Sequence, residues 1–379
     1  MGAVYVPIVK GHENDLRALS LLHQAWISTK PLIEYTLPTA GTDTAADLVT
    51  FIERIKQYVA LKETFVDFYG FPPGTSDIDG KHPVAAAFDT IRAYGLPVTP
   101  VVGFDREVAL ERTEQMWREL VDLVIAIGRG CCFRVDIDEL DGPQEETWDK
   151  IVERSAQLKI APSQTDVVID LRSIRDRDEH ALKDLVIDFA LGAGKFVPRS
   201  MILAGSSALH TVKDVPENGT LSVERKELRL WAEIFADTQF PFPLIFGDYG
   251  VVYPDFDREG SFGNINAKIR YTANDKIHYF RGKLYSKVEP LEQYHMLSQQ
   301  VMASPYYIGS GYSFGDRYIH DCVRGREKPR QPGPWVLADQ NHHFVHTAHQ
   351  MEILVPRLAG AEQMDIDSLL AGTAPAVYS

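Results

Sequence analysis

Short runs of β-branched and other apolar residues recur along the chain and alternate with longer segments of helical periodicity. There are eight such runs, at Tyr5–Val9, Pro31–Thr36, Thr64–Phe68, Pro97–Val102, Cys131–Ile137, Asp166–Leu171, Ser200–Ala204 and Pro243–Phe246. Runs of this kind predict strands of a buried parallel sheet, and the segments between them predict amphipathic helices that cover the sheet. The alternation therefore restricts the chain to an α/β architecture.

Helices are predicted in seven of the intervals. They are Asn14–Gln24, Thr44–Leu61, Pro83–Tyr94, Arg106–Ile127, Glu145–Leu158, Asp178–Leu191 and Ser222–Ala236. Eight strands with seven intervening helices, ending near residue 250, are typical of a (β/α)8 barrel of TIM type, which takes about 250 residues. A doubly wound open sheet is the alternative. Against it, the first strand continues into VKGHEND, which lacks a glycine-rich dinucleotide fingerprint.

The alternation stops beyond residue 250. Ile269–Tyr271 and Ile277–Gly282 flank TANDK and predict a hairpin. Helices are predicted at Leu291–Met302, Phe314–Val323 and Phe344–Leu358. We therefore expect a barrel over residues 1–250 and a C-terminal hairpin-plus-helices extension over residues 251–379 that packs on it. Whether the extension caps the barrel or completes its eighth unit stays open at this stage.

Charge and cysteine content limit the partners. A net charge of −14 argues against general nucleic-acid binding, which needs an excess of Lys and Arg. No apolar run reaches the roughly 20 residues that cross a bilayer, and the first residues do not resemble a signal peptide. Cys131, Cys132 and Cys322 fit no zinc or disulfide spacing, so we expect buried thiols in a cytoplasmic protein.

Polar residues recur at or near the carboxyl ends of the predicted strands. They are Lys10, Glu34, Asp67, Arg134, Asp136, Asp170, Arg172, Ser206, Ser207, Asp248 and Tyr249, with Asp105 a little beyond the fourth strand. In a barrel these ends meet at one rim, where TIM-barrel active sites are built. Because a buried carboxylate is costly unless it is paired, its repetition predicts a polar site. The alternative is a network of ion pairs, for instance Arg134 with Asp136, that closes the barrel.

These residue types allow more than one chemistry. The candidate catalytic acids are Glu34, Asp136, Asp170 and Asp248, and the candidate metal ligands, for Mg²⁺ or Mn²⁺, are Asp67 and Asp248. The candidate substrate-binding residues are Lys10, Arg134, Tyr249 and Arg270, whose cations suit phosphate or carboxylate. Metal-assisted phosphoryl chemistry and a metal-free carboxylate pair, as in glycosidases, both stay open.

The stretch WVLADQNHHFVHTAHQ supplies a second group of polar residues. His342 and His346 are four residues apart, so they share a face of any helix there. One hypothesis is that Asn341–His343 folds over the rim. His342 or His343 would then be a general base, and Asn341 and Trp335 would contact substrate. The alternative is that Asn341 caps a helix that starts there and the histidines lie on its surface.

Several short stretches resemble the beta protein family of phages and bacteria. They are VPIVKGHENDLRAL, PLIEY, FGDYG, IRYT, FGDRYI and NHHF, which together span nearly the whole chain. The resemblance marks seven positions for test, namely Lys10, Glu34, Asp248, Tyr249, Arg270, Asn341 and His342. It implies no mechanism.

The leading hypothesis is a phosphodiesterase-like hydrolase whose rim site acts on a phosphate-bearing or other anionic small substrate. A second hypothesis is a non-catalytic barrel that binds a protein or peptide partner in phage–host conflict. A third is a glycosidase-like carboxylate pair. If the charged residues were scattered over both ends of the barrel, the leading hypothesis would fail.

Overall fold

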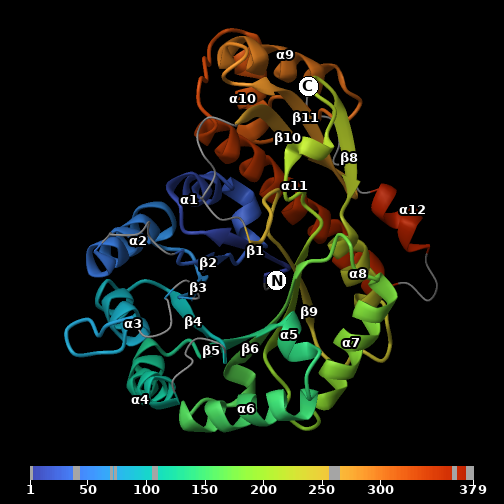
Figure 1. The fold of residues 1–379 in the computed structure, drawn as a ribbon. Coiled ribbons are helices and arrows are strands. Elements are labelled where there is room, and N and C mark those ends of the chain that lie inside the picture. The colour runs from blue at the N-terminus through green and yellow to red at the C-terminus, as the bar shows by residue number, and fades with distance from the viewer. Residues whose placement is uncertain are drawn as a thin grey trace.

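Eight parallel strands form a closed barrel in the order β1-β2-β3-β4-β5-β6-β7-β9 (Figure 1). The computed structural model describes residues 3–36, 43–68, 71, 75–104, 110–255, 265–360 and 365–372. The strands are β1 (Tyr5–Lys10), β2 (Leu32–Glu34), β3 (Thr64–Asp67), β4 (Val98–Val102), β5 (Cys131–Asp136), β6 (Thr165–Ser173), β7 (Ser200–Ser206) and β9 (Leu244–Asp248). Each predicted apolar run contributes one strand, which confirms the TIM-type barrel.

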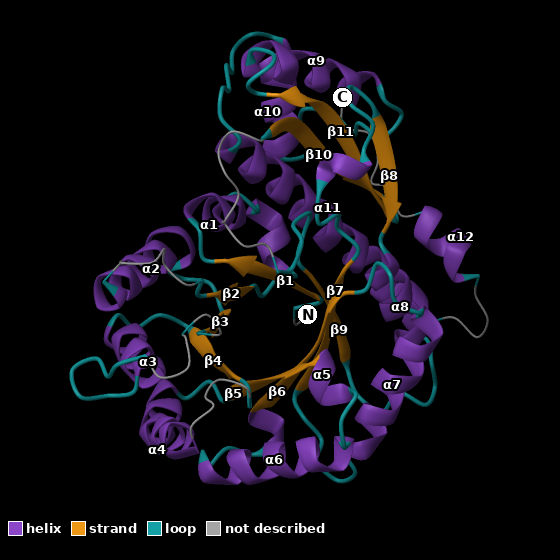
Figure 2. Cartoon of the chain, viewed as in Figure 1, coloured by secondary structure: helices purple, strands orange, loops and turns teal. Residues whose placement is uncertain are grey.

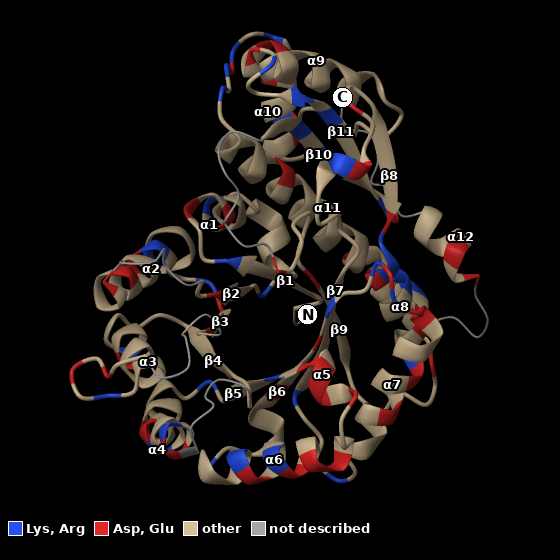
Figure 3. Cartoon of the chain, viewed as in Figure 1, with Lys and Arg blue, Asp and Glu red and all other residues tan. Residues whose placement is uncertain are grey.

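Helices surround the barrel (Figure 2). They are α1 (Glu13–Ser20), α2 (Thr44–Val59), α3 (Pro83–Ala93), α4 (Leu110–Ile127), α6 (Gln144–Gln157), α7 (Glu179–Gly192) and α8 (Lys226–Phe235). Short helical elements join them, namely η1 (His23–Ile27), α5 (Ile137–Leu140), η2 (Pro162–Gln164) and η3 (Val212–Asp214). Asp43 and Asp178 cap α2 and α7 through backbone N–H groups. Charged residues gather on the outward faces of these helices (Figure 3), as expected for amphipathic helices.

The barrel interior is filled by side chains from alternate strand positions. One apolar cluster holds Val6, Ile8, Leu32, Phe65, Val101, Cys132, Val168, Ile202, Ala204 and Tyr249. The opposite strand faces pack against the helices in the main core. Successive residues of a strand point to opposite faces. Only the polar residues on the inward face at the carboxyl end of each strand therefore contribute to the rim. The three cysteines are free and buried, as expected.

The extension is built on an antiparallel sheet in the order β10-β11-β8. Its strands are β8 (Thr220–Glu224), β10 (Asn266–Ala273) and β11 (Lys276–Leu284), and α9 (Pro290–Ala303) and α10 (Phe314–Val323) pack with it. The expected hairpin and these two helices are present. The start of the expected helix Ser222–Ala236 is different, because β8 pairs with β11 and the helix begins only at Lys226. A strand that precedes residue 250 thus belongs to the extension sheet.

Helix α11 (Gly333–Ala359) lies between the barrel and the extension sheet (Figure 1). It begins eleven residues before the expected Phe344, with a proline in its first turn, where the missing N–H is tolerated. Most of its residues are buried because it contacts α1 and β1 as well as α10 and β10. The last element, α12 (Ile366–Ala371), packs on α8. Within the described residues, no helix is long and apolar enough to cross a membrane.

Candidate functional site

Arg134 lies at the centre of a buried polar network inside the carboxyl end of the barrel. Its Nη1 donates to Asp67 Oδ2 at 2.7 Å, and its Nε and Nη2 donate to Asp170 Oδ2 at 3.0 and 2.5 Å. Nη2 is also 2.6 Å from Glu34 Oε1. These carboxylates come from β2, β3 and β6, and all four side chains are buried. One guanidinium therefore binds three carboxylates that the chain supplies far apart in sequence.

Tyr249 and Lys10 complete this inner network. The Tyr249 hydroxyl donates to Asp170 Oδ2 at 2.6 Å and accepts from Arg134 Nη2 at 2.8 Å. Lys10, at the end of β1, forms an ion pair with Glu34. Burial alone would raise the pKa of the Glu34 carboxyl, but Lys10 and Arg134 outweigh it and hold that pKa well below its usual range. Glu34 is therefore ionised at neutral pH and cannot donate a proton.

Asp170 has the same electrostatic character as Glu34. Burial opposes its ionisation, but Arg134 and Arg172 outweigh the burial and lower the pKa of its carboxyl. Both inner carboxylates can therefore hold cations in place but cannot act as acids near neutral pH. Their role in any reaction is electrostatic.

A second layer of charged side chains lies outside this network. Arg172 Nε donates to Asp136 Oδ2 at 3.0 Å and is 3.2 Å from Asp170 Oδ2. The exposed fractions are 18% for the Lys10 side chain, 10% for Arg172 and 23% for Asp136, whereas the inner acids are almost fully enclosed. A ligand at the rim can therefore reach Lys10 and Arg172, with Asp136 and the exposed Asp255 beside Arg172.

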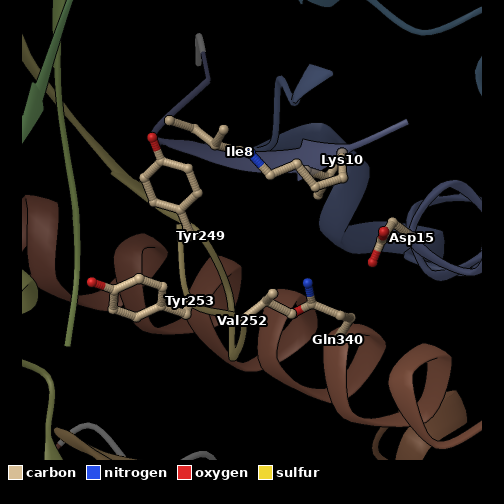
Figure 4. A pocket seen from close by; sticks show the side chains of 8 residues that line it. Ile8, Lys10, Asp15, Tyr249, Val252, Tyr253 and Gln340 are labelled. Carbon is tan, nitrogen blue, oxygen red and sulfur yellow. The ribbon is translucent and has the colours of Figure 1, made fainter. Parts of the chain in front are cut away.

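A small pocket opens beside Lys10 (Figure 4). It is lined by Ile8, Val9, Lys10, Asp15, Tyr249, Val252, Tyr253 and Gln340. Its free space, about 20 Å³, holds roughly one or two water molecules. The Lys10 ammonium lies 6.0 Å from the centre of the Tyr249 ring. On the α11 side, Gln340 Oε1 accepts from the Val251 N–H at 3.0 Å. Helix α11 therefore forms one wall of the pocket.

Asp248 does not belong to the rim network, contrary to expectation. It precedes Tyr249, and successive residues point to opposite faces, so Tyr249 enters the barrel and Asp248 points outward. Its carboxylate accepts from the Tyr5 hydroxyl at 2.7 Å and from Arg225 Nη2 at 3.1 Å. It also lies 2.8 Å from His343 Nε2. Asp248 is thus buried between the barrel wall, α8 and α11, and forms no wall of the rim site.

The two histidines connect α11 to the extension and do not reach the rim. His343 Nδ1 is 2.7 Å from Thr272 Oγ1 on β10. His342 Nδ1 lies 2.8 Å from Asp316 Oδ2, and its Nε2 lies 2.8 Å from the Thr272 carbonyl oxygen. Because both partners of His342 are acceptors, its ring carries two protons. Burial lowers the pKa of His342, but Asp316 outweighs it, so the net shift is upward.

The other expected residues of the C-terminal part are also structural in their contacts. Arg270 Nε donates to Asp339 Oδ2 at 2.9 Å, away from the rim network. Trp335 is buried in the extension, where it stacks on Tyr294 with ring centres 4.6 Å apart. Asn341 Nδ2 donates to the Ala18 carbonyl at 3.0 Å from the interior of α11. Asn341 therefore does not cap a helix that starts there; its Oδ1 accepts from the Gly315 N–H in the first turn of α10 at 3.3 Å. Neither it nor His342 or His343 lies on the surface.

The expected metal ligands, Asp67 and Asp248, lie in separate clusters. Asp67 binds Arg134, and Asp248 binds Arg225. Across the described ranges, no group of three or more His, Cys, Asp or Glu side chains is arranged to hold a metal ion. The space between Glu34, Asp67 and Asp170 is occupied by a guanidinium, so these donors do not fit a divalent cation. Asp105 lies outside the described residues.

The comparison with known families agrees with the extent of the fold. A model of the Beta protein family matches residues 5–349, which include every residue of the rim network. The chain belongs to the Beta protein family. No curated protein matches this Beta protein family member.

Two solved structures are similar to this Beta protein family member in part. One is a type I 3-dehydroquinate dehydratase from Clostridium difficile with covalently modified comenic acid, at 10% identity and a TM-score of 0.41. That match covers 68% of this chain and 88% of the dehydratase chain. The other is a putative oxidoreductase from Escherichia coli K-12, at 12% identity and a TM-score of 0.23, over 66% of this chain and 100% of the other.

Ser207 and Glu227 form a buried pair near Arg225 in this Beta protein family member. The Ser207 hydroxyl donates to Glu227 Oε2 at 2.6 Å and accepts from the Lys226 N–H at 3.1 Å. The Ser206 hydroxyl accepts from the Ala208 N–H at 3.1 Å. The Ser207 hydroxyl therefore joins the loop after β7 to the start of α8, the Ser206 hydroxyl bonds within that loop, and neither hydroxyl bonds to the rim network.

Glu227→Gln is expected to change how stability depends on pH. Burial raises the pKa of Glu227 to about 7 from an ordinary value of 4.5. The folded state then holds the proton more tightly than the unfolded state, so wild-type stability falls as pH rises between these values. Glutamine stays neutral. As pH rises from about 5 to about 8, the free energy of unfolding of the variant should increase relative to that of wild type by up to about 3 kcal/mol. Urea unfolding at each pH measures it.

Glu233→Gln is the matched control, because Glu233 lies on α8 and is partly exposed. Its unfolding free energy should follow that of wild type across the same pH range. A Glu227→Gln curve parallel to the wild-type curve would show that Glu227 is ionised in the folded protein near neutral pH.

Proposed function

We propose that the rim network of this Beta protein family member is the active site of a hydrolase for small anionic substrates that carry phosphate. The observation that carries the proposal is the set of groups a ligand can reach. Lys10 and Arg172 are cations that solvent reaches, and the partly exposed carboxylates beside Arg172 are Asp136 and Asp255. Asp255 lies 3.6 Å from Arg172 and 58% of its side chain is exposed, so an incoming anion can displace it. Two cations at one rim favour an anion over a cation or a neutral sugar.

The inner layer would orient the reachable cations. It holds three carboxylates and one guanidinium, and its excess negative charge attracts Lys10 to Glu34 and Arg172 to Asp170. Glu34 and Asp170 are enclosed, so they hold these cations in place and are not themselves exposed to the ligand. A cation that is already in position before the substrate binds does not have to move during the reaction, so the free-energy cost of reorganising the site is smaller.

Phosphate ester hydrolysis suits such a site, because it depends mainly on positioning and on stabilisation of charge. The Lys10 ammonium would bind the phosphate oxygens. The oxygen of a water molecule would attack phosphorus while the bond from phosphorus to the leaving oxygen breaks. Asp136 would accept a proton from this water, and the leaving oxygen would take a proton from Lys10 or from solvent. No step in this scheme passes through a metal.

Lys10→Ala and Asp136→Asn test the proposal. We expect Asp136→Asn to lower kcat by about 10²–10⁴, the usual contribution of a general base. Lys10→Ala should lower kcat/KM by about tenfold or more, because it removes a charged contact with the substrate. The measurement is hydrolysis of a panel of nucleotides, sugar phosphates and phosphodiesters, together with the melting temperature of each protein in its presence.

Lys183→Ala is the control for loss of a lysine. Lys183 lies on α7 and pairs with Asp237 at 3.0 Å, outside the rim network. It should retain wild-type activity. If wild-type protein neither binds nor hydrolyses any member of the panel, or if both rim variants keep full turnover, the proposed hydrolase is wrong.

The second candidate is a non-catalytic barrel that binds a protein or peptide partner in phage–host conflict. One observation favours it. The inner carboxylates are all ion-paired, and the pKa values of Glu34 and Asp170 are held down, so neither titrates near neutral pH. The same observation disfavours a glycosidase pair that includes either acid, because that chemistry needs a protonated carboxyl group. Failure of the whole anion panel would move support to the partner-binding barrel.

A cytoplasmic location is part of the proposal. The three cysteines, at Cys131, Cys132 and Cys322, are buried free thiols, as is usual where the environment is reducing. Burial raises the pKa of the Cys131 thiol and keeps it unreactive.

A further inference from the structure

Arg172 has an unusual backbone conformation for its place in the fold. It lies within β6, yet its φ is 54°, in the left-handed region that side chains other than glycine rarely adopt. The other described non-glycine residues with positive φ lie outside strands; they are His23, Asp79, Lys159, Asn218 and Asn274. Arg172 is therefore a strained residue inside the barrel wall, at the end where the rim network lies.

Asp170 holds this conformation. Its Oδ1 accepts from the Arg172 backbone N–H at 3.0 Å, while its Oδ2 receives Arg134 and Tyr249. The pairing of β6 with β7 also shifts register between Asp170 and Ser173. A register shift of this kind redirects the side chain at the irregular position. The surrounding structure thus imposes the strain, and the strain determines where the Arg172 guanidinium points.

The redirected guanidinium lies in the reachable layer of the site. Its Nε contacts Asp136 and Asp170, and its Nη1 is 3.6 Å from Asp255 Oδ1, whose side chain is 58% exposed. Asp255 is exposed and can turn to solvent, and Asp136 can give up its Oδ2 contact with Arg172 while its Oδ1 still caps α5, so an incoming anion can take their place. Lys10 pairs with Glu34, and both Lys10 and Arg172 lie close enough to Glu34 to lower the pKa of its carboxyl, so the two cations lie near one group.

We propose that Arg172 recognises the phosphate group of the substrate and that its strained backbone is kept for this purpose. The inference rests on the proposed function and assigns the residue that binds the phosphate group. A planar guanidinium matches two phosphate oxygens at once, and together with Lys10 it supplies two positive charges for a dianion. On binding, the guanidinium exchanges Asp136 and Asp255 for phosphate oxygens and keeps Asp170. Strained residues of this kind gather at ligand sites, where the strain opposes stability.

Substitution of Arg172 by residues that accept a positive φ separates function from stability. Arg172→Gly and Arg172→Asn relieve the strain and remove the guanidinium, and both keep the backbone N–H that Asp170 accepts. Relief of the strain opposes the loss of the ion pairs with Asp136 and Asp170, so we expect both to melt near the wild-type temperature without ligand. We expect inorganic phosphate to bind them about tenfold or more weakly, by calorimetry and by its effect on melting temperature. Arg172→Lys keeps the charge and the strain, and should bind phosphate more weakly than wild type.

Arg175→Gly is the matched control. Arg175 lies just after the end of β6, has no positive φ, and pairs with the exposed Asp214 at 3.6 Å. It should keep wild-type phosphate binding and melt at or below the wild-type temperature. If wild-type protein binds neither inorganic phosphate nor any phosphate ester, the proposed function is wrong and this inference with it. Wild-type binding that persists unchanged in Arg172→Gly and Arg172→Asn would overturn the inference alone. A large fall in the melting temperature of both variants would show that Arg172 is kept for stability.

Discussion

Arg134→Met should destabilise the protein by about 3–5 kcal/mol or more, because it leaves buried carboxylates without their cation. Asp67 and Asp170 would lose the guanidinium, and Glu34 would keep only Lys10. Methionine fills much of the same volume, so the loss is mainly electrostatic and not that of a cavity. The free energy of unfolding in urea at neutral pH measures it, provided that unfolding is two-state.

The pH dependence of this loss distinguishes charge from packing. Without Arg134, burial would raise the carboxyl pKa values, so the folded variant would take up protons more readily than its unfolded chain. Its deficit relative to wild type should then shrink as pH falls toward about 5. Arg154→Met is the control, because Arg154 pairs with the exposed Glu114 on the surface, and we expect a loss of at most about 1 kcal/mol. A deficit equal at all pH values would assign the effect to packing.

The eight strands could be predicted from the sequence because a parallel barrel strand is buried on both faces. Runs such as Ser200–Ala204 are therefore continuously apolar and short, which separates them from the amphipathic helices. The same property hides which face of each strand points inward. In the run PLIFGDYG, both faces are apolar up to Gly247, so nothing in the sequence shows that Tyr249 enters the barrel and Asp248 leaves it.

Pairing within the network also lay beyond the sequence. Arg134 and Asp136 are two residues apart and share a strand face, which suggested a mutual ion pair. In the closed barrel, neighbouring strands bring Asp170 to Arg134, and Arg172 to Asp136. Polar residues at the ends of predicted strands identified the residues of the rim. Which of them form ion pairs depends on how the barrel closes. Arg172 is among the strand-end residues, but its positive φ has no signal in the sequence.

The burial of helix α11 could not be predicted from its hydrophobic pattern. It contacts α1 and β1 on one side and α10 and β10 on the other, so it lacks the polar face that marks a surface helix. Its polar residues are buried and find partners far away, as Asn341 does at Ala18 and Asp339 at Arg270. From the sequence alone, the polar residues of such a helix are predicted to lie on the surface or to cap the helix. Only the fold shows the buried partners to which they bond.

Asp248→Asn should destabilise the protein by about 3–5 kcal/mol, because Asp248 connects three parts of the fold. Its carboxylate binds Tyr5 of β1, Arg225 at the start of α8, and His343 of α11. Burial would raise the pKa of this carboxyl, but His343 and Arg225 outweigh it and hold the pKa well below its usual range. The stabilisation is therefore complete above about pH 4, the unfolded value, and is lost as pH falls below it.

The double variant Asp248→Asn with Arg225→Met shows whether the loss comes from an unpaired charge. Arg225 is fully buried and, when Asp248 is neutralised, would keep the neutral partners Thr347 and Gln350 and a longer contact of 3.7 Å with Glu227 Oε1. Removing the guanidinium as well removes the uncompensated charge, so the double variant should be more stable than the sum of the single losses predicts. Asp237→Asn, at a surface pair with Lys183, is the control and should cost at most about 1 kcal/mol. Strict additivity of the two single losses would mean that Asp248 stabilises the junction through Tyr5 and His343, and that its ion pair with Arg225 contributes nothing.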